Sequence, residues 1–109
     1  MKLLRANTTY NFDLNGRNPQ VPPKTADGVT IEIGARCSLT DVSGPGPVAM
    51  LVIGQVVTLI KNTAATPISG TFSNLPDGST VVVGINKYQV NYSGGEGGND
   101  LTLTALPPG

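Results

Sequence analysis

The sequence predicts an all-β fold, either a compact sandwich or a short β-roll or β-helix-like stack of eight or nine short strands. Three observations support this class. The chain has 11 Val and 12 Thr, and β-branched side chains pack well on strands. Short segments of alternating apolar and polar residues are separated by Gly, Pro and Asn at intervals of about ten residues. No segment keeps a convincing helical period, and a chain of 109 residues is expected to form a single domain, residues 1–109.

The first half of the chain contains three expected strands. Apolar and polar residues alternate strictly in residues 9–14, which predicts a half-buried strand, and the Asn-Gly dipeptide that follows favours a tight turn. Residues 17–27 hold three prolines and are expected to form an irregular connection. Alternation resumes in residues 29–33 and again in residues 37–42, which predicts two further strands.

The second half opens with a break rich in Pro and Gly at residues 43–47. The apolar stretch 48–60 follows, and its β-branched content together with Gly54 favours two strands over the alternative of a helix. Residues 74–78, NLPDG, have the composition of a turn, and residues 93–99 form a glycine-rich loop. The strands expected here are residues 48–53, 56–61, 68–73, 81–83, 87–92 and 101–104. No clean internal repeat is evident, so the sequence does not indicate a solenoid over its whole length.

The composition argues against several classes of function. Seven basic and seven acidic residues give a formal net charge of zero, so we expect no nucleic-acid partner. The absence of His excludes Ser-His-Asp triads and His-ligated metals, and a single Cys excludes an intramolecular disulfide. No apolar run approaches the roughly 18 residues of a membrane span, so no membrane insertion is expected. A low density of charge weakens repulsion between copies, which favours self-association.

One block of the second half is more specific than its composition. It reads GTFSNLPDG at residues 70–78 and YSGGEGGNDLTLT at residues 92–104, with an expected hairpin between the two. This block closely resembles the C-terminal module of bacterial surface and secreted proteins with autotransporter-associated β-strand repeats. The resemblance covers roughly residues 8–104 and is strongest at residues 70–104, where the glycine loop is one Gly longer than usual.

The resemblance implies a scaffold and no catalytic residue. It implies the end piece of a long right-handed β-helix in an extracellular or cell-surface protein, with a role in display or adhesion. The first five residues, MKLLR, contain only two adjacent apolar residues after the Met, which is too few for the core of a signal peptide. If such a module stands alone, the edge that would meet an upstream coil is unpaired, and unpaired edges favour a homo-oligomer. We therefore expect a non-enzymatic structural or adhesive module.

Two alternatives of other classes stay open at the level of the sequence. A small carbohydrate-binding module could use Tyr88 and Tyr92, which share one face of an expected strand and could stack on a sugar if exposed. A small hydrolase could use paired carboxylates from Asp13, Glu32 and Asp41 if the fold brought two of them to about 5 to 9 Å in a cleft.

The glycine-rich loop also raises the question of calcium. Residues 94–100, GGEGGND, resemble half of a calcium-binding nonapeptide turn, with Glu96, Asn99 and Asp100 as candidate ligands. Calcium takes six to eight oxygens, and one loop supplies about half of them. The alternative is a plain glycine turn that Asn99 and Asp100 cap, with no cofactor.

The single cysteine, Cys37, has no His to activate it as a nucleophile. It alternates with Leu39 in an expected strand. We therefore expect Cys37 to be a small buried residue rather than a reactive one.

Overall fold

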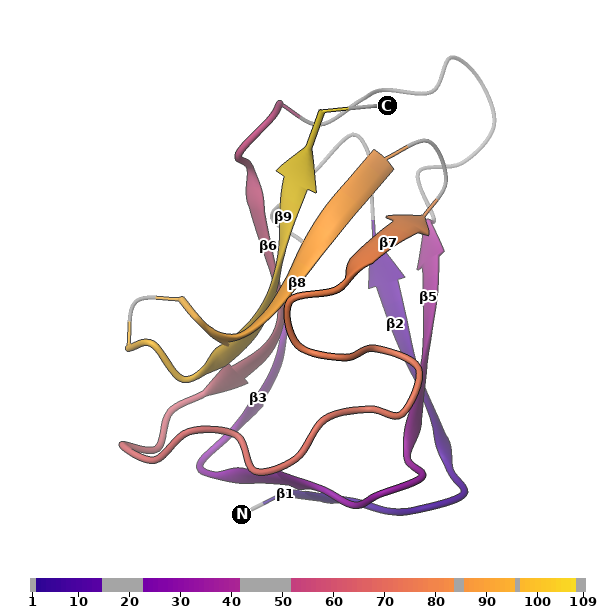
Figure 1. Ribbon diagram of the computed structural model, residues 1–109. Coiled ribbons are helices and arrows are strands. Elements are labelled where there is room, and N and C mark those ends of the chain that lie inside the picture. Colours follow the sequence, from indigo (N-terminus) through magenta and orange to yellow (C-terminus); the bar gives the residue numbers. More distant parts are fainter. Residues whose placement is uncertain (1, 15–22, 42–51, 84–85, 96, 108–109) are drawn as a thin grey trace.

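The computed structural model describes residues 2–14, 23–41, 52–83, 86–95 and 97–107, and every regular element in these ranges is a β-strand, which confirms the all-β class (Figure 1). The strands are β1 (Lys2–Leu4), β2 (Thr9–Leu14), β3 (Lys24–Ala26), β4 (Val29–Ile31), β5 (Arg36–Asp41), β6 (Val56–Asn62), β7 (Thr80–Val83), β8 (Asn86–Gly94) and β9 (Asp100–Leu106).

The first six strands form three parallel pairs. β1 pairs with β4, β2 with β5, and β3 with β6. Lys2 pairs with Val29 and Thr9 with Arg36, so the first two pairs have the same register offset along the chain (29 − 2 and 36 − 9). The chain thus follows the same three strand directions twice. We call β1, β2 and β3 the first passage and β4, β5 and β6 the second, and each strand of the second passage lies beside its counterpart in the first (Figure 1).

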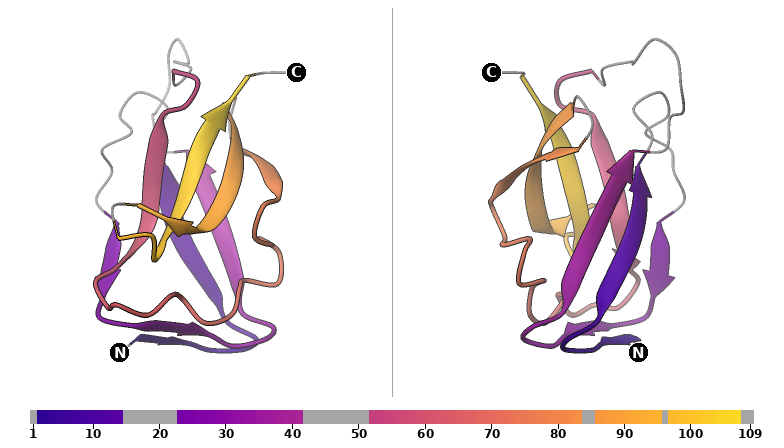
Figure 2. Two further views of the ribbon diagram at one scale, coloured as in Figure 1. Left: turned by 60° about the vertical axis from the view of Figure 1, so that its left-hand side comes forward. Right: turned by 90° about the vertical axis from the view of Figure 1, so that its right-hand side faces the viewer.

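A partial third passage follows β6. Ser69 forms an isolated parallel bridge with Thr30, and Ser73 donates its main-chain N–H to the carbonyl of Ala35 at 2.8 Å. The chain then reverses into the antiparallel strands β7, β8 and β9, and β9 joins β6 to give a five-stranded sheet of order β3-β6-β9-β8-β7. The two turned views show β8 and β9 on one side of the molecule and the β2–β5 pair on the other (Figure 2).

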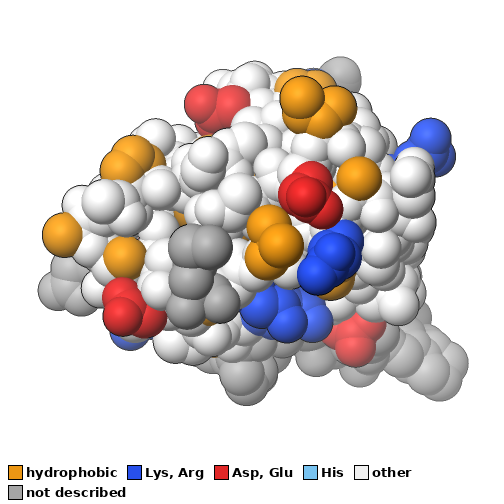
Figure 3. Space-filling view, turned by 90° about the horizontal axis from the view of Figure 1, so that it is seen from below, with side chains coloured by type: hydrophobic (Ala, Val, Ile, Leu, Met, Phe, Trp, Pro, Cys, Tyr) orange, Lys and Arg blue, Asp and Glu red, His pale blue; other side chains and the backbone are white. Residues whose placement is uncertain are grey.

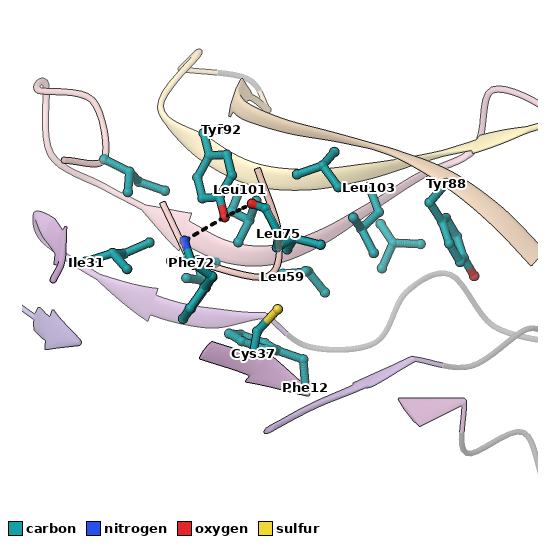
Figure 4. Close-up of a cluster of buried hydrophobic side chains, with 14 of the residues drawn as sticks. Phe12, Ile31, Cys37, Leu59, Phe72, Leu75, Tyr88, Tyr92, Leu101 and Leu103 are labelled. Carbon is teal, nitrogen blue, oxygen red and sulfur yellow. Dashed lines mark hydrogen bonds between the residues drawn. The ribbon is translucent and has the colours of Figure 1, made fainter. Parts of the chain in front are cut away.

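The hydrophobic core lies between these layers (Figure 4). Alternate residues of β8 point inward, as the period of two in a strand requires, and most residues of β9 are buried. Phe72, on the third passage, is fully buried, and its ring meets that of Phe12 edge-on with centroids 5.9 Å apart. The core therefore joins residues from all three passages of the chain.

The expected strands are confirmed for residues 9–14 and for the hairpin of β7 and β8, and the turn at residues 74–78 contains Gly78 at φ 79°. Other expectations were wrong. Residues 68–73 form isolated bridges, because only Ser69 and Phe72 find bridge partners. Residues 52 and 53 lead into a turn that the positive φ of Gly54 allows, and the rest of the strand expected at 48–53 lies outside the described residues.

Candidate functional site

The two tyrosines proposed for sugar stacking are buried. Tyr88 is 0% exposed and Tyr92 is 5% exposed. The Tyr92 hydroxyl donates to the carbonyl of Leu75 at 2.6 Å and accepts from the N–H of Phe72 at 3.1 Å (Figure 4). Burial raises the pKa of the Tyr92 phenol above its usual value. The condition of exposure that the sugar-stacking alternative requires is not met: both rings belong to the core, because the face that they share with Val90 points inward.

Two of the carboxylates proposed for hydrolysis, Asp13 and Glu32, lie on different parts of the fold. Asp13 is exposed on β2. Glu32 lies at the corner between β4 and β5, where its Oε1 accepts from the N–H of Ala6 at 3.0 Å. Ala6 precedes β2, and the four-residue step from Thr9 to Asp13 alone spans roughly 13 Å. A glycosidase needs its carboxyl groups about 5 to 9.5 Å apart. Asp41 pairs with Leu14 at the end of β5, and its side chain lies outside the described part of the structure.

Two of the side chains proposed as calcium ligands, Asn99 and Asp100, bond to the main chain of the neighbouring segment 62–64. Asp100 is 8% exposed, and its Oδ1 accepts from the N–H of Asn62 at 2.9 Å. Asn99 donates its side-chain amide to the carbonyl of Ala64 at 3.1 Å. Glu96 lies outside the described residues, and within them no group of three or more His, Cys, Asp or Glu side chains could hold a metal ion. In the loop itself, Gly95 has a φ of 76°, as a glycine turn allows.

Cys37 is a buried residue, as expected, at 5% exposure. Burial raises the pKa of its thiol to about 11, so the thiol is protonated at neutral pH. Its main chain is held by Asn74, which the sequence placed in a turn without predicting this contact. Asn74 Oδ1 accepts from the Cys37 N–H at 3.0 Å, and Asn74 Nδ2 donates to the Cys37 carbonyl at 2.7 Å. The Asn74 amide thus stands in for a strand beside β5.

One end of the stack of strands presents unpaired main chain, and we call it the open end. It is the edge of β1, β2 and β3 that faces away from β4, β5 and β6. Because Arg36 N–H donates to the carbonyl of Thr8, alternate residues of β2 face β5 and those between them face away. In the same way, the carbonyl of Leu4 accepts from Glu32 N–H, and the carbonyl of Ala26 accepts from Thr63 N–H. Leu4 and Ala26 therefore face the second passage, and their neighbours Leu3 and Thr25 face away from it. The residues whose N–H and C=O face outward at this end are Leu3, Thr9, Asn11, Asp13 and Thr25. Among the described residues, no strand lies on this outer side of β1, β2 or β3.

Among the described residues, the chain itself covers β4, β6 and the first residues of β5 at the opposite end of the stack. Ser69 bonds to the main chain of Val29 and Ile31. Ser73 bonds to Ala35, and Asn74 covers Cys37. β6 is paired by β9 on the side away from β3. The two ends of the same stack therefore differ in hydrogen bonding.

Two hollows border the strands of the open end. The first, of about 220 Å³, is lined by Asn11, Phe12, Asp13, Lys24, Val57, Thr58 and Leu59. The second, of about 250 Å³, is lined by Lys2, Leu4, Lys24, Thr25, Ala26, Val29 and Ile60. In both, strands of the first passage supply part of the lining, and β4 or β6 supplies the rest. Lys24 borders both hollows, and its ammonium lies 5.2 Å from the centroid of the Phe12 ring.

Charges of both signs lie at this end of the molecule, with Lys2 and Lys24 on the lining of the hollows beside Asp13. The view from below, onto the side of the molecule where β1 lies, also shows acidic and basic side chains near one another, with apolar side chains in small separate groups (Figure 3). A partner at the open end would therefore meet a surface of mixed charge.

Comparison of the chain with protein-family models, with curated protein sequences and with solved structures finds no match. Within the residues that the structure describes, no helix is long and apolar enough to cross a membrane.

Proposed function

We propose that the chain is a non-enzymatic structural or adhesive module of a bacterial surface protein, built as the closing unit of a β-helix-like stack, and that it associates through the strand edges of its open end. The observation that carries this proposal is the difference between the two ends. Three strand edges are unpaired at one end among the described residues, and Ser69, Ser73 and Asn74 cover the other.

The regular offset of the first two passages supports a stacking role. β1 lies on β4 and β2 on β5 with one and the same register offset, and Leu4 and Phe12 pair with Ile31 and Leu39. A further passage placed on β1, β2 and β3 would find outward main-chain groups to bond and two hollows to receive its inward side chains. The resemblance at residues 70–104 to a module that ends a β-helix supports the same role.

The side chains considered for catalysis support a structural reading. Glu32 caps a corner of the main chain, and Asp13 lies far from it along β2. The Cys37 thiol is buried with a raised pKa, which makes it a poor nucleophile. Glu32 is placed by its hydrogen bond to the main chain, Asp13 by its exposure to solvent, and Cys37 by its packing in the core.

The test is to add one passage at the open end. A second copy of the segment from Lys2 to Gly28, which ends just before the partner of Lys2 in β4, is placed directly before Lys2. We expect the added unit to fold on β1, β2 and β3, so that the far-ultraviolet circular dichroism per residue is kept. Unfolding in urea should remain a single transition with a larger m-value, because more surface is exposed on unfolding.

The matched control carries the same segment in shuffled order. This unit should remain unfolded, so that brief proteolysis removes it and leaves the original chain. If the ordered duplicate is removed as fast as the shuffled one, the open end does not accept a further passage and the proposed role is wrong.

A further inference from the structure

We infer that a second copy of the chain covers the open end, giving a closed two-fold dimer and not a filament. This inference rests on the proposed structural role and names the partner for the same edges. Its starting point is the polarity of the stack, which has one end with unpaired strands among the described residues and one end that the chain has already closed.

The closed end decides the symmetry. A head-to-tail contact would bring the open end of one copy to the main chain of Val29, Ala35 and Cys37 in the next, and these groups already bond to Ser69, Ser73 and Asn74. At these positions the closed end offers no free main chain, whereas a second open end offers three strand edges, so the open end fits best against another open end. A contact of one surface with itself is isologous and stops at two copies.

β2 is the strand best suited to lie at the two-fold axis. It is six residues long, whereas β1 and β3 have three residues each. A two-fold axis between copies makes the two β2 strands antiparallel. The outward residues Thr9, Asn11 and Asp13 are spaced evenly about Asn11, so Asn11 would face Asn11 of the second copy and Thr9 would face its Asp13.

The charge of the molecule permits this contact. The formal net charge is zero, and the lining of the hollows carries Lys2 and Lys24 as well as Asp13. Two copies therefore meet without repulsion between uniform fields of like charge. The outer edge of β7 is a weaker candidate, because it offers one four-residue strand.

The experiment measures the mass of the full chain by light scattering after gel filtration, from low micromolar to millimolar protein. We expect the wild type to pass from monomer to dimer and no further. In Asn11→Pro, an N–H that faces the second copy is lost, while the bonds of β2 to β5 remain because Tyr10 and Phe12 supply them. This variant should be monomeric over the whole range.

The matched control is Val82→Pro. Val90 N–H donates to the carbonyl of Ser79, so alternation places Val82 N–H on the outer edge of β7. This variant should dimerise as the wild type does. If Asn11→Pro fails to fold by circular dichroism, Asn11→Lys keeps the N–H, brings two positive charges to the axis and should weaken dimerisation at least tenfold.

Four outcomes would overturn the inference: a wild type that stays monomeric, a mass that rises beyond the dimer, a dimer that survives the folded Asn11 variant, or a dimer lost equally in Val82→Pro. None of them would decide the stacking role, because the chain with a duplicated first passage is a different molecule and its folding is measured separately.

Discussion

Polar side chains replace main-chain partners where this stack turns or ends. The side-chain Oδ1 of Asn62 accepts from the main-chain N–H groups of Gly28 and Ala64, and its side-chain Nδ2 donates to the carbonyl of Thr66. Asn74 does the same for Cys37. A buried main-chain group without a partner costs more than a hydrogen bond returns, so these amides stabilise the fold by preventing that cost. Asn62 and Asn74 are therefore part of the hydrogen bonding that holds the turns and the strand end in place.

The Tyr92 hydroxyl gives the first prediction. Tyr92→Phe leaves the N–H of Phe72 and the carbonyl of Leu75 without this partner inside the core, so the free energy of unfolding in urea should fall by about 1 to 3 kcal/mol. Tyr10→Phe is the control, since the Tyr10 hydroxyl accepts from Arg5 at an exposed site, and it should cost less than about 1 kcal/mol. Equal losses in the two variants would show that the Tyr92 hydroxyl is not buried as described.

The Asp100 carboxylate gives the second prediction. Asp100→Ala removes the acceptor for Asn62 N–H and should lower the free energy of unfolding by about 1 to 3 kcal/mol. The loss should be equal in millimolar calcium and in chelator, because the carboxylate accepts directly from the main chain at the end of β6. Asp13→Ala, at an exposed position, should change stability by less than about 0.5 kcal/mol. A loss seen only with calcium would establish the loop as a metal site.

At the scale of elements, the close contact of successive passages limits which residues fit between them. Gly70 has a φ of 83° and lies against β4, where an added Cβ would collide with the carbonyl oxygen of Ile31. Gly78 has a similar φ of 79°, but an added Cβ there would meet nothing within 4 Å. Substituting Gly78 therefore measures the free-energy cost of the left-handed backbone alone, and substituting Gly70 adds the cost of a steric clash with β4.

We predict that Gly78→Ala lowers the free energy of unfolding by about 1 to 2 kcal/mol, which is the cost of a left-handed conformation. Gly70→Ala should cost more than about 3 kcal/mol, because the third passage must also move away from β4. Thermal unfolding of both variants measures this difference. Equal melting temperatures would mean that residue 70 does not pack on β4.

Local patterns in the sequence predict some of these elements and miss others. Strict alternation located β2, and a hairpin signal located β7 and β8, because both patterns are local. β1 and β3 have three residues each, too few for a period, and β3 follows a segment with three prolines. Their strand conformation depends on distant partners, since Lys2 pairs with Val29 and Lys24 with Ile60, and no local pattern reports such pairing.

The same reason explains what could be predicted of the site. Tyr88 and Tyr92 were correctly placed on one face, but alternation does not say which face points inward. The repeat between the first two passages was missed because Lys2 pairs with Val29 and Leu14 with Asp41, so equivalent positions differ in residue type. The unpaired edge was inferred only through the resemblance, and its location on β1, β2 and β3 required the strand register.

At the scale of the whole molecule, two buried acids link stability to pH. Burial raises the pKa of Cys37 from 9.0 to about 11 and raises the pKa of Tyr92 as well. Both groups are neutral when protonated, so above pH 9 the unfolded chain loses protons that the folded chain keeps. Their contribution to stability is complete below the unfolded pKa values and is lost as pH rises through the folded ones.

We therefore predict that the urea midpoint falls between pH 9 and pH 11, starting near the ordinary pKa of a thiol. Cys37→Ala should make this fall shallower, because one of the two titrating groups is gone. Only the slopes are compared, since the substitution also removes core packing. An unchanged slope in Cys37→Ala would mean that the thiol ionises as readily in the folded protein as in the unfolded one.

The most direct test of the open end, and of the second copy that covers it, is amide hydrogen exchange along β2. It is measured residue by residue with NMR at low and at high protein concentration. Tyr10 and Phe12 N–H face β5 and should exchange slowly at both concentrations. Asn11 and Asp13 N–H face the open end and should exchange fast when the protein is dilute and slowly when it is concentrated. Equal exchange of all four amides, or exchange of Asn11 and Asp13 that does not depend on concentration, would contradict an open end that a second copy covers.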